Sequence, residues 1–313
     1  MVCVRIYLCT MKIALFFAAL SLTLSCSEHN VQSSNQIVTT TTLVGDWVRQ
    51  LAPDGIVVIN LMGPGTDPHT YKPSFADYQN IRNADYLVLS GLHLEGKMAE
   101  AIMALEKDKK VWNMASAIPE NKFIKSEGFK DGYDPHYWMD IEMVIMAIEG
   151  LEKEMILWFP EQQSRIEQKA KLYKERLLAE QEAMKVLLHK VPEAKRVLIT
   201  SHDAFNYFSR AYQYEVRSLQ GFSTAAEFGI RDVTNLVDFI AERQIPAVFV
   251  ENIVSSQALD AVVQGCEKRG VKVRIGGNLF TDALGDAQSG ADSYIEMMKK
   301  NAQTLALALG NPN

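Results

Sequence analysis

The feature that most constrains the fold is a regular alternation of short β-branched runs with longer amphipathic stretches, beginning near residue 36. Such an alternation is typical of a parallel β-sheet whose strands are connected by helices. The expected strands form two series of four, at 37–42, 56–62, 85–90 and 110–114, and at 196–201, 214–219, 247–251 and 271–277. We therefore expect an α/β protein with two lobes, each with a four-stranded parallel sheet flanked by helices.

A segment with neither Gly nor Pro separates the two series, between Pro160 and His189. It is rich in Glu, Gln, Lys, Ala and Leu, and its apolar residues recur at helical spacing. Pro160 suits the first turn of a helix, and Pro192 ends one. A helix of about thirty residues would be about 45 Å long, enough to pack along both lobes. The apolar stripe is not a sustained heptad, so we expect one rigid linking helix at 159–191 in a monomer, rather than a coiled coil.

The first residues are typical of an export signal. From Met11 there is one Lys, then an apolar run too short to span a bilayer, then small residues before Cys26. These small residues resemble a lipoprotein cleavage box, although Thr23 stands where such boxes usually have Leu. We expect residues 1–25 to be a removed signal peptide, and Cys26 to be lipidated at the start of a polar tether, 26–35. Plain secretion with an idle Cys26 is the alternative.

Composition and charge exclude further classes of protein. The formal net charge is -6, so the chain offers no basic patch for nucleic acid. Of the four cysteines, only Cys266 lies in the body of the chain, which excludes an internal disulfide framework and predicts a buried apolar role for this side chain. The body divides into an N-terminal lobe at 36–158 and a C-terminal lobe at 192–313, on either side of the linking helix.

Four metal-ligand side chains stand where expected strands give way to loops: His69, His136, His202 and Asp282. His69 and His136 each end an Asp-Pro-His tripeptide, whose proline stiffens the backbone ahead of the imidazole. Open α/β sheets bind ligands at the carboxyl ends of their strands, and two of the four residues fall in each lobe. Three imidazoles and a carboxylate suit a borderline divalent cation such as zinc or manganese, so we expect the ion between the lobes.

Each of these residues also has an ordinary structural interpretation, as a surface loop histidine or as a turn or helix-capping aspartate. The run Ser201-His202-Asp203 is not a catalytic triad, because consecutive residues do not point at one another in the required way. Four protein ligands without an adjacent nucleophile or general base suit holding an ion, so we expect no enzyme activity; a secreted zinc-dependent hydrolase is the alternative. Glu251, at the end of its strand, is the candidate acceptor that orients a ligating imidazole.

The segments that carry these residues occur in a particular order: GPGTDPHTYKPSFADYQNIRNADYLVLSGLHLEG, DPHYWMD, SHDAFNYFSRAYQ, LQGFSTAAEFGIRD, FVENIVSS and GGNLFTDALGD. Together they resemble the metal-binding proteins of bacterial zinc and manganese ABC importers, which are often lipoproteins and are sometimes called adhesins. The resemblance covers residues 36–310. It implies two parallel-sheet lobes joined by a rigid backbone helix, with the ion in the cleft and with ligands at the four positions named above.

The resemblance also implies a role in transport. Such a protein captures an ion in the periplasm or another extracytoplasmic space, and docks on a membrane permease that a cytoplasmic ATPase drives. The ion is transported cargo, zinc or manganese, with iron as a further candidate. Typical manganese binders of the family have Glu in place of the third His, and typical zinc binders often have a long His- and acid-rich loop between the first two ligands. With His202 and only the short stretch KSEGFKDGYDP, the chain matches neither pattern. No residue gives independent evidence of adhesion.

Overall fold

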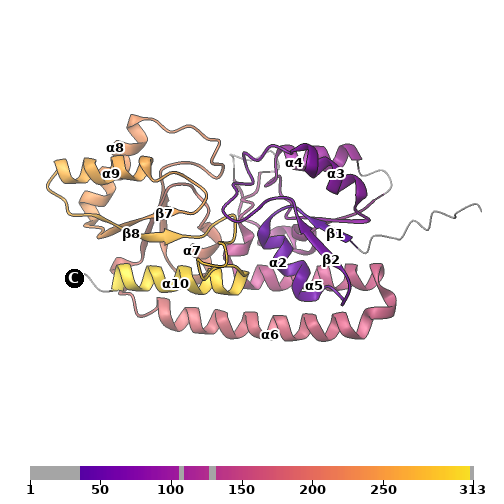
Figure 1. Ribbon diagram of the computed structural model, residues 1–313. Helices are drawn as coiled ribbons and strands as arrows, with labels where there is room; N and C mark the ends of the chain where they lie inside the picture. The colour runs from indigo at the N-terminus through magenta and orange to yellow at the C-terminus, as the bar shows by residue number, and fades with distance from the viewer. Residues whose placement is uncertain (1–35, 106–108, 127–131, 311–313) are drawn as a thin grey trace, which may run out of the picture. The chain divides into compact units, whose positions relative to one another are not determined.

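The computed structural model describes residues 36–105, 109–126 and 132–310. The expected signal peptide, the tether and Cys26 lie outside these residues. The described part of the chain belongs to one compact unit. Within it, no helix is both long and apolar enough to cross a membrane. The expected fold class is confirmed, with parallel sheets flanked by helices in two lobes (Figure 1).

The first lobe contains a four-stranded parallel sheet of order β2-β1-β3-β4. Its strands and their helices are β1 (Gln36–Thr39), α2 (Thr42–Leu51), β2 (Val57–Asn60), α3 (Phe75–Asn83), β3 (Tyr86–Leu89), α4 (Lys97–Leu105) and β4 (Lys110–Asn113). All four strands fall inside the runs predicted from β-branched content or within one residue of them. Local capping fixes where two helices begin: Thr41 accepts a hydrogen bond from the amide of Val44, and Ser74 and Asp77 form a capping box.

The second lobe differs in one respect from the expectation of a single four-stranded sheet. Its strands, β5 (Val197–Thr200), β6 (Glu215–Ser218), β7 (Ala247–Glu251) and β8 (Arg274–Leu279), are paired two by two, as β5-β6 and β7-β8. Where the pairs meet, the Oε1 atom of Glu251 accepts from the amides of Ser201 and His202, at 2.7 and 2.9 Å. A side chain, rather than a strand ladder, therefore joins the two pairs beside the candidate ligand His202.

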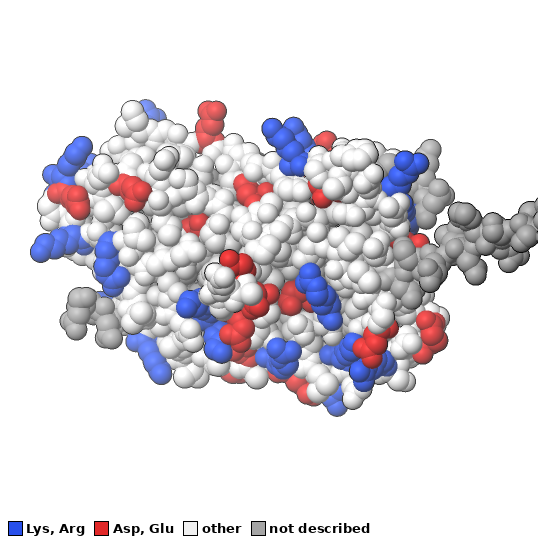
Figure 2. Space-filling view, in the orientation of Figure 1, with Lys and Arg blue, Asp and Glu red and all other residues white. Residues whose placement is uncertain are grey.

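Helices cover the second lobe as well. They are α7 (Asn206–Tyr212), α8 (Ile230–Arg243), α9 (Gln257–Lys268) and α10 (Tyr294–Gly310). Cys266 is fully buried on α9 among Val237, Ile240 and other apolar side chains, as the sequence predicts. Charged side chains of both signs are interspersed over the face of the molecule shown in Figure 2, rather than gathered in one basic area.

The predicted linking helix is present as a turn, η5 (Pro160–Gln162), followed by α6 (Gln163–Leu188). It packs along α5 (Ile141–Trp158) and α2 of the first lobe and along α10 of the second (Figure 1). Its buried residues recur at helical spacing: Ile166, Ala170, Tyr173, Leu177, Gln181, Met184 and Leu188. Because one helix contacts both lobes along its length, it restricts how far they can separate.

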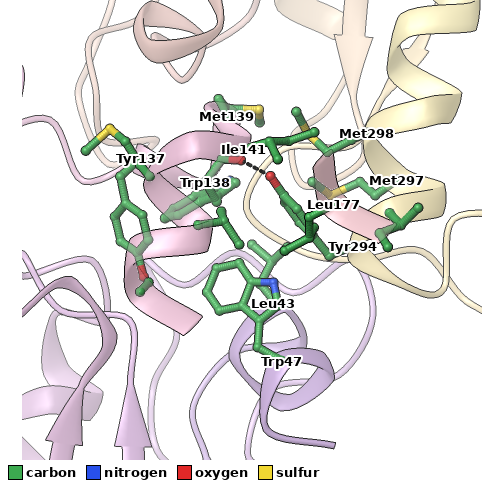
Figure 3. Close-up of a cluster of buried hydrophobic side chains, with 14 of the residues drawn as sticks. Leu43, Trp47, Tyr137, Trp138, Met139, Ile141, Leu177, Tyr294, Met297 and Met298 are labelled. Atoms are coloured by element: carbon green, nitrogen blue, oxygen red, sulfur yellow. Dashed lines mark hydrogen bonds between the residues drawn. The ribbon is translucent and has the colours of Figure 1, made fainter. Parts of the chain in front are cut away.

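A buried aromatic layer continues from one lobe into the other (Figure 3). The indole Nε1 of Trp138 donates to the carbonyl of Thr281 at 2.9 Å, and the Tyr294 hydroxyl donates to the carbonyl of Trp138 at 2.6 Å. Trp138 lies two residues after His136, and Thr281 directly precedes Asp282. This packing therefore fixes the distance between two candidate ligands that come from opposite lobes.

Candidate metal centre

The four predicted ligands meet at one place between the lobes. Each of His69, His136, His202 and Asp282 offers a ligand atom, and these atoms all lie within 4.8 Å of one another. Asp282 is at the centre of the group: its Oδ2 lies 3.1 Å from Nε2 of His69 and 3.2 Å from Nε2 of His202. Its Oδ1 lies 3.6 Å from Nε2 of His136. The structure thus brings together residues that the sequence separates widely.

The two Asp-Pro-His tripeptides form the same turn. In one, the amide of His69 donates to Oδ1 of Asp67 at 2.9 Å; in the other, the amide of His136 donates to Oδ1 of Asp134, also at 2.9 Å. An aspartate that accepts from the amide two residues later is a common local turn, and the intervening proline fixes its own φ angle. The repeat in the sequence therefore encodes a repeated local geometry, which presents an imidazole on each occasion.

A second layer of carboxylates faces the outer nitrogens of two rings. Nδ1 of His136 lies 2.7 Å from Oδ1 of Asp134, and Nδ1 of His202 makes a very short contact with Oε2 of Glu251. When Nδ1 carries the proton and donates it to the carboxylate, Nε2 presents its lone pair to the centre. Glu251 therefore occupies the position predicted for it. Asp134 was not predicted as such a partner, because its tripeptide shows no sign of which way the ring turns.

Burying these polar side chains costs folding free energy unless they bind a ligand. The side chains of His136, His202 and Asp282 are completely buried, and that of His69 is 2% exposed. Among the described residues, Nε2 of His136, Nε2 of His202 and both carboxylate oxygens of Asp282 have no hydrogen-bond partner outside this group of four side chains. A buried polar atom left without a partner costs about 1–3 kcal/mol. Four such atoms facing one point fit a cation with nitrogen and oxygen ligands.

The charges in this group shift its pKa values. Burial lowers the pKa of His69, since it disfavours the charged ring. Burial acts the same way on His136, but the carboxylates of Asp282 and Asp134 outweigh it and raise the pKa of this ring to about 9. For His202, burial is outweighed by Glu251 and Asp282, which hold its pKa well above the usual value. Despite its burial, Asp282 has a pKa well below the usual value, because the rings of His202 and His136 favour its charged form. Without a metal, the rings of His136 and His202 therefore favour the charged imidazolium form at neutral pH.

Over residues 37–308 the chain matches the model of a protein family described as zinc-uptake complex component A, periplasmic. The chain belongs to this family. The match begins one residue into β1 and ends within α10, so it covers all four candidate ligands and both lobes.

Relatives in the zinc-uptake family have names that refer to two different metals. The manganese-binding lipoprotein MntA of Bacillus subtilis (strain 168) is 38% identical over 300 residues, which cover 95% of this chain and 97% of MntA. The structure of the periplasmic zinc-binding protein TroA from Treponema pallidum is similar, with a TM-score of 0.85 and 34% identity over 88% of this chain and 99% of that one. The manganese ABC transporter substrate-binding lipoprotein PsaA of Streptococcus pneumoniae is 27% identical over 306 residues, covering 95% of this chain and 97% of PsaA.

The contacts of Ser201, His202 and Asp203 in this structure do not form a catalytic triad. The amide of Ser201 is bound to Glu251, and Oδ1 of Asp203 accepts from the Asn206 side chain at 2.9 Å. The His202 ring instead lies between Glu251 and Asp282. Nothing in this arrangement directs the Asp203 carboxylate at the His202 ring, as a triad requires.

Proposed function

We propose that this chain captures a divalent transition metal ion outside the cytoplasm and delivers it to the membrane permease of an ABC importer. The ligands are the imidazoles of His69, His136 and His202 and the carboxylate of Asp282. The observation that carries the proposal is the convergence of these ligand atoms within 4.8 Å, where the buried ring nitrogens and carboxylate oxygens of His136, His202 and Asp282 face the same point. Family membership supports the same role, since the family is described as a component of a zinc-uptake complex.

The cargo is zinc or manganese, with iron(II) as a third candidate of the same class. Three imidazole nitrogens favour zinc, because zinc lies above manganese and iron in the affinity order for nitrogen ligands. A carboxylate that binds through both oxygens raises the coordination number, which favours manganese. The relatives support both, since MntA is named for manganese and TroA for zinc at 38% and 34% identity.

Holding the ion, rather than using it for catalysis, accounts for the arrangement of the site. Four protein ligands complete a tetrahedral zinc shell, whereas catalytic zinc sites keep one position for water or substrate. Two outer carboxylates, Asp134 and Glu251, orient rings toward the ion. The names of the relatives refer to metal binding and transport, which favours this role over a secreted hydrolase.

We further propose that the chain is exported as a monomer and anchored to a membrane by a lipid on Cys26. Residues 1–25 are then the removed signal peptide, and residues 26–35 are the tether that carries the two lobes (36–158 and 192–313). Support comes from the sequence before Cys26 and from the relatives MntA and PsaA, both named as lipoproteins. Metabolic labelling with a radioactive fatty acid tests the anchor: label should enter the wild-type protein and be absent from Cys26→Ala.

Metal retention after dialysis tests the site itself. Wild-type protein should retain zinc or manganese, whereas His202→Ala should lose it and keep its circular dichroism spectrum. His189→Ala is the matched control, because His189 is an exposed histidine just beyond the end of α6 and should leave retention unchanged. Equal retention in wild type and His202→Ala would remove His202 from the site.

A further inference from the structure

A loop between β6 and α8, residues 219–229, is bound to the segment that carries His202. The amide of Gln220 donates to the carbonyl of Ser201 at 2.8 Å, and the amide of Asp203 donates to the carbonyl of Gly221 at 3.2 Å. These two bonds lie on either side of His202 in the sequence. The base of the loop is therefore fixed to the second lobe at a candidate ligand.

The tip of this loop is an ordered turn. The amide of Ala226 donates to the carbonyl of Ser223 at 2.9 Å, and the amide of Ala225 donates to the Ser223 hydroxyl at 3.2 Å. The side chain of Gln220 reaches across the loop to the carbonyl of Ala226 at 3.1 Å. Thr224, inside this turn, is consequently held in a defined position by three hydrogen bonds that do not involve its own side chain.

Thr224 reaches across to the first lobe. Its hydroxyl donates to Oδ2 of Asp67 at 2.6 Å, while Oδ1 of Asp67 accepts from the amide of His69 at 2.9 Å. The Thr70 hydroxyl, from the same loop as His69, also donates to Oδ2 of Asp67, at 2.8 Å. One carboxylate thus connects the backbone of a candidate ligand in the first lobe to a hydroxyl in the second lobe.

This contact lies outside the buried core, as does a second bond from the same loop, which the amide of Gly65 donates to the carbonyl of Leu284 in the second lobe at 3.1 Å. The hydrogen bonds of Trp138 with Thr281 and of Tyr294 with Trp138 are buried in the core. Asp67 and Thr224 are partly exposed, and His69 is the one residue of the four candidate ligands that is not fully buried. The contact therefore lies on the side where the metal group is closest to solvent.

We infer that the hydrogen bond from Thr224 to Asp67 is a latch that holds the His69 loop against the second lobe and slows the departure of the bound ion. The inference rests on the proposed function of the site. Thr224 and Asp67 act as positioning residues, because neither touches the ion. The long helix α6 limits wide separation of the lobes, so local release of the His69 loop is the smaller motion that frees a ligand.

The rate of metal dissociation tests the latch directly. Wild-type and variant proteins are loaded with zinc or manganese, mixed with excess chelator in a stopped-flow instrument, and followed by the absorbance of the chelator complex. Thr224→Val removes the hydroxyl at nearly constant volume and should speed dissociation by about tenfold, the effect expected for one hydrogen bond to a charged acceptor. Thr224→Ser keeps the hydroxyl and should restore the wild-type rate.

Two further variants separate a latch from a general effect. Thr234→Val makes the same substitution at an exposed threonine on α8 and should leave the rate unchanged. Thr70→Val removes the donor to Oδ2 of Asp67 that comes from the same loop, and should speed dissociation less than Thr224→Val does. Equal acceleration in Thr70→Val and Thr224→Val would assign the effect to the His69 loop alone and overturn the latch.

The melting temperature of the metal-free protein completes the test. It should differ by only a few degrees between wild type and Thr224→Val, because the substitution removes one partly exposed hydrogen bond and leaves the core intact. An unchanged dissociation rate in Thr224→Val, with metal bound by the wild type, would refute the latch and leave the proposed function intact. A wild-type protein that retains no ion would instead refute the proposed function.

Discussion

The Nε2 atom of His69 lies 3.1 Å from the Oδ2 atom of Asp282, although the two residues come from loops in opposite lobes. This distance is short enough for the carboxylate to accept a hydrogen bond from the N–H of the ring when no metal is present. A cation bound at the same point would replace that proton and attract both groups. These two atoms belong to different lobes, so the candidate site forms only when the two lobes pack together.

Substitution of Asp282 by Asn should abolish tight metal binding. Asp282 is the one carboxylate of the four-ligand group, and the neutral amide can neither neutralise the cation nor bind it through two anionic oxygens. The loss should exceed the factor of about 10–100 that outer partners of metal ligands typically contribute. Competition with a chelating dye measures the affinity. Asp286→Asn, at an exposed aspartate in the same loop, is the control, and an unchanged affinity in Asp282→Asn would contradict the assignment.

Asp134→Asn should weaken metal binding by about 10–100-fold while leaving the ligands in place. The carboxylate lies 2.7 Å from Nδ1 of His136, and the amide removes the charge that keeps the proton on that nitrogen. The same titration measures the change, and Asp260→Asn, on the exposed side of α9, serves as the control. Binding equal to wild type would show that Asp134 fixes only the local turn and not the ring.

Metal affinity should rise with pH through the range in which His136 loses its proton, at about 9. The pKa of His136 is raised to about 9 in the metal-free protein, and that of His202 is also raised, so both rings carry an exchangeable proton at neutral pH. A protonated ring cannot bind a metal, so binding releases protons, and affinity falls as pH decreases through this range. Asp282 stays ionised, because its pKa is well below the usual value.

Calorimetry in buffers with different ionisation enthalpies counts these protons. At about pH 7, more than one proton should be released per ion bound, and the release should decrease as the pH rises through about 9. Two simple imidazoles with pKa values near 6.5 would together release only about half a proton at pH 7. Release of half a proton or less at pH 7 would therefore show that the surrounding carboxylates do not raise the pKa values in solution.

The linking helix offers a matched pair of stability variants. Leu177 on α6 is fully buried, whereas its neighbour Leu178 is 49% exposed. Leu177→Ala should lower the free energy of unfolding by about 2–5 kcal/mol, since it removes buried methyl groups and leaves a cavity. Leu178→Ala should change it by about 0.5 kcal/mol or less, as is usual for surface substitutions. Urea unfolding of the metal-free proteins measures both, and equal effects would contradict the buried face assigned to the helix.

Much of this molecule could be predicted from its sequence, because the signals were local. Short β-branched runs located the strands, and a long stretch without Gly or Pro located α6. The candidate ligand set followed from residue chemistry at strand ends, together with the family resemblance, and the structure brings its four members together. A local sequence pattern could not predict contacts between residues that are distant in the sequence or the direction in which a side chain points. The orientation of Asp134 toward the His136 ring and the approach of Thr224 to Asp67 both depend on tertiary packing.

The pairing of strands in the second lobe shows the same limit. The four runs predicted strands but not their partners, and β-branched content cannot tell one four-stranded sheet from two pairs. Glu251, a polar residue at the end of an apolar run, was the visible sign of a special position there. Its carboxylate accepts hydrogen bonds from the amides of Ser201 and His202, just after β5, and also contacts the ring of His202.

The metal content of the purified protein tests the proposed site. Residues 27–313, stripped of metal and then given equimolar zinc, manganese and iron(II), would be dialysed and measured by elemental mass spectrometry. One ion of one preferred kind should be retained per chain, and it should be lost in His69→Ala with the fold unchanged. Absence of any retained ion in the wild type, or equal retention in His69→Ala, would contradict the proposed site.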